Sequence, residues 1–233
     1  MPIKLFHRWH PTLALRYLPM LKYIDSKDRV LEVGSGTLGI GPYLNKKFTG
    51  ADIEFSGPKW PQMKRVIASA TKLPFKDKSF DVVVNSDMLE HLPQKDRQQA
   101  INEIMRVANK TIIIGVPIGK KAHNQDKKLD QIYLKVHGER HQFLEEQTEF
   151  GLPKTSDITK SIDIAVKKHN TKYKLTIIPN MNLSIRMWLM KGWISKNPLT
   201  NIFFRKILLL VIPILRLFNH QPVYRKIFVI KLI

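Results

Sequence analysis

The 233-residue chain contains no cysteine, which excludes disulfide scaffolds, cysteine nucleophiles and thiolate metal sites. Its 11 glycines and 14 prolines follow no period, so the chain is not collagen-like. Long apolar runs are missing as well: the longest, 207–215, contains Pro213 and is far shorter than the ~20 residues of an ordinary membrane span. Residues 1–21 lack the apolar core of a signal peptide. We therefore expect a cytoplasmic protein.

Acidic residues are scarce and unevenly placed. Against 39 Lys and Arg there are 19 Asp and Glu, which gives a formal net charge of +20. No acidic residue follows Asp163, whereas 13 Lys or Arg occupy the last 70 positions. A genome-wide preference for lysine codons would explain surplus lysine, but it would not remove every acid. A region of one sign this long indicates an anionic partner, such as a membrane or a nucleic acid.

The apolar pattern predicts a parallel α/β sheet, because short β-branched runs without alternation are typical of strands covered on both faces. With 43% hydrophobic residues, the chain can also bury a sizeable core. Strands are expected at 29–33, 48–53, 65–68, 80–85, 111–116, 173–178 and 224–232. Helices are expected within 8–24 and at 40–46, 96–107 and 156–168, with two more inside 183–219. Residues 119–136 are polar and predict a mobile loop or an irregular helix.

A glycine-rich turn follows the first predicted strand. In VLEVGSGTLGIG (30–41), Gly34, Gly36 and Gly39 have the spacing of a nucleotide-binding loop, in which the backbone approaches a ligand at a helix N-terminus. Asp52 ends the second strand, where a carboxylate can accept hydrogen bonds from ribose hydroxyls. A dinucleotide site would match equally well to this point, and Asp52 could also be a simple turn cap.

Further motifs separate these readings. Glu32 precedes the first glycine by two residues, and LPFKDKSFDVVV (73–84) and NSDMLEHL (85–92) follow. In this combination, residues 28–118 resemble the class I S-adenosylmethionine-dependent methyltransferases, specifically the type-11 methyltransferase domain. The resemblance implies a Rossmann-like three-layer sandwich with a mostly parallel seven-stranded sheet, and S-adenosyl-L-methionine as cofactor.

The same resemblance implies a domain organisation. Residues 1–28 would form an N-terminal helical segment, and 29–233 the methyltransferase domain. Within it, 29–118 would be the cofactor half and 119–182 the acceptor or lid half. A basic, hydrophobic helical insertion, 183–221, would then precede the last strand at 222–233.

Cofactor-binding roles carry over residue by residue from the resemblance. Glu32 would support the loop, and Gly34, Ser35 and Gly36 would line the methionine part. Asp52 would hold the ribose, Ile53 would pack on the adenine, and the backbone at Asn85 would meet the methionyl end. Ser69, followed by Ala70, stands where the family carries an aspartate that bonds the adenine amino group. A serine can still accept that bond, but without the charge-assisted component.

The catalytic residues are less defined. Methyl transfer from a sulfonium depends on alignment, and a base is needed only if the acceptor carries a proton. Candidate bases are Glu90, His91 and His141, although His91 could instead cap a turn or orient a lid. The spacing of His137 and His141 would allow two zinc ligands, but without an evident third we predict no metal.

The sequence narrows the classes of molecule that could accept the methyl group. Cytosine C5 methylation needs a cysteine, and NSDM replaces the N/D-P-P-Y/F motif of adenine N6 enzymes. Residues 183–219 interleave aromatic and aliphatic side chains with basic ones, a pattern typical of an element lying on an anionic membrane. We therefore predict a small or lipid-like acceptor and peripheral membrane attachment.

Other readings stay open. The 183–219 segment could pack into the core or a dimer interface, or it could serve RNA in a tRNA or rRNA methyltransferase. The chain could also be a non-catalytic interaction module with a cofactor fold. The sequence does not predict the oligomeric state.

Overall fold

The computed structural model describes residues 11–233, so the start of the predicted N-terminal helical segment lies outside the described residues. A seven-stranded sheet has the order β3-β2-β1-β4-β5-β7-β6. Strands β1 to β5 pair in parallel, and β7 runs antiparallel to both of its neighbours. The predicted Rossmann-like sheet is confirmed. Its strands are β1 (Val30–Val33), β2 (Phe48–Asp52), β3 (Met63–Ile67), β4 (Phe80–Ser86), β5 (Ala108–Pro117), β6 (Tyr173–Asn182) and β7 (Val223–Leu232).

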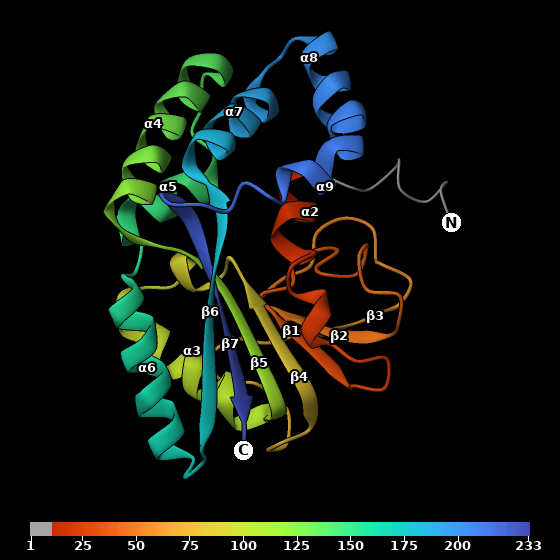
Figure 1. The fold of residues 1–233 in the computed structure, drawn as a ribbon, viewed down its shortest axis with the longest axis vertical. Helices are drawn as coiled ribbons and strands as arrows, with labels where there is room; N and C mark the ends of the chain where they lie inside the picture. Colours follow the sequence, from red (N-terminus) through yellow and green to blue (C-terminus); the bar gives the residue numbers. More distant parts are fainter. Residues whose placement is uncertain (1–10) are drawn as a thin grey trace.

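Helices lie on both faces of the sheet and beyond one of its ends (Figure 1). The longer ones are α2 (Pro11–Tyr17), α3 (Gln94–Val107), α4 (Gly119–His137), α5 (Gln142–Phe150), α6 (Thr155–Lys168) and α7 (Leu183–Ile194). Single turns are η1 (Leu21–Tyr23) and η2 (Leu89–His91). A continuous helical stretch follows α7 and comprises α8 (Pro198–Ile202), η3 (Phe203–Ile207), η4 (Leu208–Val211) and α9 (Ile212–Leu215). We call Pro198–Leu215 the outer helix.

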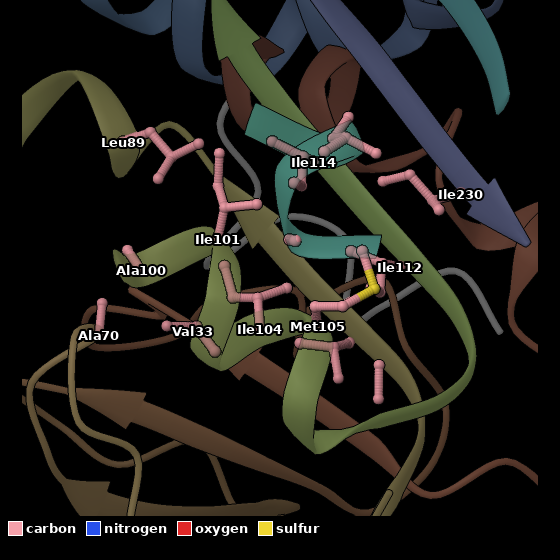
Figure 2. Close-up of a cluster of buried hydrophobic side chains, with 14 of the residues drawn as sticks. Val33, Ala70, Leu89, Ala100, Ile101, Ile104, Met105, Ile112, Ile114 and Ile230 are labelled. Carbon is pink, nitrogen blue, oxygen red and sulfur yellow. The ribbon is translucent and has the colours of Figure 1, made fainter. Parts of the chain in front are cut away.

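The alternation of β5 shows how the two cores form. Ile112 and Ile114 face a cluster built with α3 and α6, whereas Ile113 faces the opposite cluster. On the first side, Ile101 and Ile104 of α3 pack against these strand residues (Figure 2). Each fully buried aliphatic side chain of this kind contributes roughly 1.5–3 kcal/mol.

The second face is covered by elements from the two ends of the chain. Ala14 and Leu15 of α2 join Phe204, Leu208 and Ile212 of the outer helix in one buried cluster against the sheet. The predicted insertion between the sixth and seventh strands is therefore present. One side of it belongs to the core, as one of the alternative readings held.

The helix expected at 40–46 is wrong. Residues 35–46 form turns, held by i→i−3 bonds such as Gly41 N–H to the Leu38 carbonyl at 3.1 Å. Pro42 has no N–H for a helical bond, and Gly39 has a left-handed φ of +51° that interrupts right-handed helix. No helix N-terminus therefore follows the glycine turn. Trp60 packs on the core beside Gly41.

The mobile loop or irregular helix expected at 119–136 is also wrong, because α4 is a regular helix of 19 residues. Ala122 and Leu129 are fully buried on one side of it. On the same side, Asp126 pairs with Arg186 of α7 at 2.6 Å. Arg186 lies 60 positions along the chain, so local composition could not reveal this contact.

Candidate active site

A cavity of about 880 Å³ opens at the carboxyl ends of β1, β2 and β4 and is bordered by α2, α5 and α7. Such a volume is typical of small-molecule sites. Seven of the predicted cofactor residues line it: Gly34, Ser35, Gly36, Asp52, Ile53, Ser69 and Ala70. Glu32 and Asn85 are fully buried, outside the cavity lining. The topology thus brings the predicted set together.

Two carboxylates hold the glycine turn. Asp52 accepts hydrogen bonds from the N–H of Gly36 at 2.7 Å and of Ile53 at 2.8 Å. Glu32 accepts one from the N–H of Ile40 at 2.7 Å. A Cβ on Gly39 would lie 2.1 Å from the Glu32 carboxylate, so the turn closes only over a glycine. Burial raises the pKa of Glu32 to about 7.

The residues of this half fit S-adenosylmethionine. Gly36 has a φ of +55°, and no atom lies within 4 Å of the place where its Cβ would be, so the backbone is open to a ligand. Ile53 is an apolar side chain 71% exposed at the cavity, suited to covering a flat base. Among the described residues, Ser86 lines the cavity and its Oγ has no hydrogen-bond partner. One hydroxyl therefore remains to meet the cofactor.

Ser69 is less free than the sequence implied. Its hydroxyl lies 2.8 Å from that of Thr71 and accepts the Thr71 N–H at 3.2 Å. An adenine amino group would have to share this oxygen.

A charged network that the sequence did not predict closes the far side. Asp87, directly after β4, has an unusual φ of +50° and lies between Arg16 of α2, at 2.8 Å, and Arg225 of β7. Although burial opposes ionisation, the two guanidinium groups hold the pKa of Asp87 below its usual value. A strained acidic residue held on both sides commonly marks a functional site. The sequence signal for this network was Arg225, an arginine within the buried strand β7.

The three candidate bases differ in their surroundings. Glu90 is fully buried, and burial followed by the charge of Asp87 raises its pKa well above the usual value. His91 lines the cavity, with Nδ1 2.8 Å from a carboxylate oxygen of Glu146. His141 also lines the cavity, with its ring 5.0 Å from that of Trp193. Glu146 is a residue that the sequence analysis missed.

The residues considered for zinc have other contacts. The Nε2 atom of His137 lies 2.9 Å from the Ile194 carbonyl, and Tyr133 stacks on the His137 ring at 4.2 Å. Within 11–233, no three His, Asp or Glu side chains converge as metal ligands.

Comparison with known proteins places this site in a family. Residues 31–113 match the methyltransferase domain family. An uncharacterized protein of Haemophilus influenzae is 52% identical over 40 residues, which are 17% of this chain and 16% of that protein. The chain therefore matches only a small part of that curated relative.

Solved structures share the fold. An S-adenosylmethionine-dependent methyltransferase from Thermotoga maritima aligns with a TM-score of 0.55 at 14% identity, over 98% of this chain and 91% of that one. A methyltransferase of Haloferax volcanii, solved with a methyltransferase activator, aligns with a TM-score of 0.54 at 11% identity, over 94% and 89%. Residues 31–113 therefore form a methyltransferase domain, and the chain has the Rossmann-like fold of S-adenosylmethionine-dependent methyltransferases.

Proposed function

We propose that the protein transfers the methyl group of S-adenosylmethionine to a small or lipid-like, amphiphilic acceptor while attached to an anionic membrane from the cytoplasm. The observation that carries the proposal is the two-sided insertion at 183–219. One side of it completes the core, the other presents apolar side chains to solvent, and its first helix borders the cavity.

The outer helix and the residues just after it expose large apolar side chains. Leu199, Leu210 and Leu217 are 77%, 68% and 80% exposed. Others on this side are Ile202, Phe203, Ile207, Ile214 and Phe218. Scattered exposed leucines need no explanation, but a contiguous row favours an interaction surface. We call these eight residues the apolar row.

Charge favours an anionic lipid surface as the partner. Arg205 and Arg216 are exposed beside the apolar row, and Lys191 and Lys196 are exposed shortly before it. No acidic residue follows Asp163. Each basic side chain near an anionic surface contributes about 1 kcal/mol, so four support reversible attachment.

The outer helix satisfies the length and composition of a membrane span, with a mean hydropathy of 1.7 over its 18 residues. Several arguments favour lying in the interface instead. Arg205 and Lys206 fall near its middle, where charge is costly in a bilayer. Phe204 and Leu208 pack into the core, so spanning would expose the second face of the sheet.

Helix α7 connects this surface with the cavity. Met190 and Trp193 line the cavity, whereas Trp188 is 50% exposed and contacts Phe203 of the apolar row edge-on at 6.4 Å. Figure 1 shows α7 and α8 together at one end of the molecule. An amphiphile leaving the membrane would meet α7 before reaching the cofactor.

The chemistry divides between cofactor and protein. Bound S-adenosylmethionine supplies an activated methyl group, so the protein mainly binds and aligns. Asp52 and the Gly36 backbone would hold the cofactor. The network of Arg16, Asp87 and Arg225 ties α2 to the sheet.

Flotation with liposomes tests the membrane surface. The wild type should float with phosphatidylglycerol vesicles, partly survive high salt, and stay behind with neutral vesicles. The double variant Leu210→Ser/Leu217→Ser should lose most of this binding. The matched control Ile164→Ser/Ile177→Ser also removes two exposed side chains, 42% and 38% exposed, outside the insertion, and should float like wild type.

Other outcomes would redirect the proposal. Binding abolished entirely by salt, together with RNA binding, would favour the tRNA or rRNA methyltransferase. Absence of flotation would leave a small soluble acceptor. Absence of S-adenosylhomocysteine binding by calorimetry would overturn the enzyme itself.

A further inference from the structure

His91 and Glu146 come together from distant elements. Turn η2 supplies His91 and α5 supplies Glu146, with 2.8 Å between Nδ1 and Oε2. A carboxylate only accepts, so the pair favours the tautomer with the proton on Nδ1 and a free lone pair on Nε2. The nearest other carboxylate is the Glu90 oxygen, 3.9 Å from Nε2 and beyond hydrogen-bond reach.

Aromatic rings form the wall next to this histidine. Phe143 meets the His91 ring edge-on at 5.3 Å, and His141 lies 5.4 Å from Phe143 and 5.0 Å from Trp193. All four rings line the cavity. Phe143 is 57% exposed although aromatic, so its face is open to a partner. Rings at these separations prefer offset or edge-to-face contact with another flat ring.

The pKa of His91 lies below its usual value because burial outweighs the charges around it. Burial, the largest influence, lowers its pKa, and Arg16 of α2 lowers it further. Glu146 of α5 and Asp87 after β4 act in the opposite direction without outweighing burial. Glu90 beside it is fully buried, and its pKa is raised well above the usual value. A neutral imidazole with a free lone pair facing a cavity is equipped to accept a proton.

We propose that His91 is the general base of the methyl transfer, that Glu146 positions it, and that the acceptor is an aromatic hydroxyl compound whose ring lies against Phe143, His141 and Trp193. This rests on the proposed function. The hydroxyl proton passes to Nε2 of His91, and an oxygen lone pair forms the bond to the methyl carbon. The carbon–sulfur bond breaks, and its electron pair returns to sulfur, leaving S-adenosylhomocysteine.

The acceptor class follows from the base. A carboxylate acceptor is already ionised near pH 7 and needs no base, whereas an aliphatic alcohol is too weak an acid for imidazole. An aromatic hydroxyl, with a pKa of about 10 as in tyrosine, lies between them. Its ring also matches the ring-lined wall, and an apolar tail matches Met190 on the α7 side.

The test uses 4-nonylphenol, nonanoic acid and nonylamine as probes, each in phosphatidylglycerol vesicles with labelled S-adenosylmethionine. The wild type should methylate the phenol, at a rate that rises with pH to a plateau. His91→Gln should lower kcat about 100-fold, in the range of general-base catalysis. Glu146→Gln should lower kcat about tenfold with KM nearly unchanged, because it affects proton transfer more than binding.

A pH profile separates positioning from folding. Since Glu146 raises the pKa of His91, Glu146→Gln should move the midpoint of the rate profile to lower pH. The matched control Glu149→Gln, an exposed carboxylate on the same helix, should leave rate and midpoint unchanged. Nitrogen-15 NMR of the imidazole should report the Nδ1–H tautomer in wild type and a mixture in Glu146→Gln.

The outcomes of these experiments separate the proposed base, the proposed acceptor and the proposed function. A His91→Gln variant with the wild-type rate overturns the base. Methylation of the acid or the amine alone, or of no probe although S-adenosylhomocysteine binds, overturns the aromatic hydroxyl. In all these cases the proposed function stands. Loss of S-adenosylhomocysteine binding in the wild type would instead overturn the proposed function.

Discussion

The cofactor half and the helical insertion use their residues in opposite ways. In the cofactor half, individual residues have single tasks: Asp52 holds the turn, and Gly36 leaves its backbone open. In the insertion, the same residue types serve two purposes according to the side of the helix they occupy. Phe204 is 1% exposed in the core, whereas its neighbour Phe203 is 42% exposed. In the cofactor half, the identity of a residue therefore indicates its function. In the insertion, only the side of the helix on which the residue lies indicates its function.

This adjacent pair gives the largest expected effect. Phe204→Ala should lower the free energy of unfolding by about 3–5 kcal/mol, because it leaves a cavity in the core. Phe203→Ala should lower it by about 1 kcal/mol, because it removes the edge-on contact with Trp188 but leaves no core cavity. Urea denaturation of both variants measures the difference. Similar losses would mean that both faces of the outer helix are buried, which would remove the apolar row as a membrane surface.

The free energy of unfolding should depend on pH through Glu32, the buried carboxylate of the cofactor half. Because the pKa of Glu32 is raised to about 7 when folded, stability from this group is present at low pH and is lost as pH rises from its unfolded value toward 7. By linkage the loss is about 3 kcal/mol at most. Glu32→Gln keeps an acceptor for the Ile40 N–H and should remove this loss.

The measurement is the stability difference between Glu32→Gln and wild type at pH 4.5 and pH 8. The variant should gain about 2–3 kcal/mol relative to wild type at the higher pH. An equal difference at both values would show that Glu32 is ionised in the folded protein, despite its burial.

Sequence predicted the strands of residues 29–118 because their signals are local, whereas the cofactor-binding roles of residues in this range stay predictions. Strands of β-branched residues and the glycine spacing both lie within a few positions of one another, so seven predicted residues meet at one cavity. The helix expected at 40–46 is wrong because Pro42 and the left-handed Gly39 interrupt right-handed helix. The role proposed for Ser69 stays a prediction.

Long-range pairing explains what the sequence could not predict. Helix α4 buries Ala122 and Leu129 and pairs Asp126 with Arg186 of another helix. Glu146 meets His91 across 55 positions, and Asp87 meets Arg225 across 138. No motif connects such residues until the sheet order is known. The acceptor side of the cavity, built by these pairs, was consequently the part least defined by sequence.

The smallest expected effect concerns the ribose assignment of Asp52. Asp52→Ala should weaken S-adenosylhomocysteine binding by roughly 1–3 kcal/mol, as for lost hydrogen bonds to a charged group. Calorimetric titration measures it, and circular dichroism checks the fold. Part of the loss would come from the freed Gly36 N–H, so Asp52→Asn, which keeps one acceptor oxygen, should lose less. If folded Asp52→Ala binds S-adenosylhomocysteine like wild type, the Asp52 carboxylate serves only to hold the turn. The identity of a residue would then indicate its function no better in the cofactor half than in the insertion.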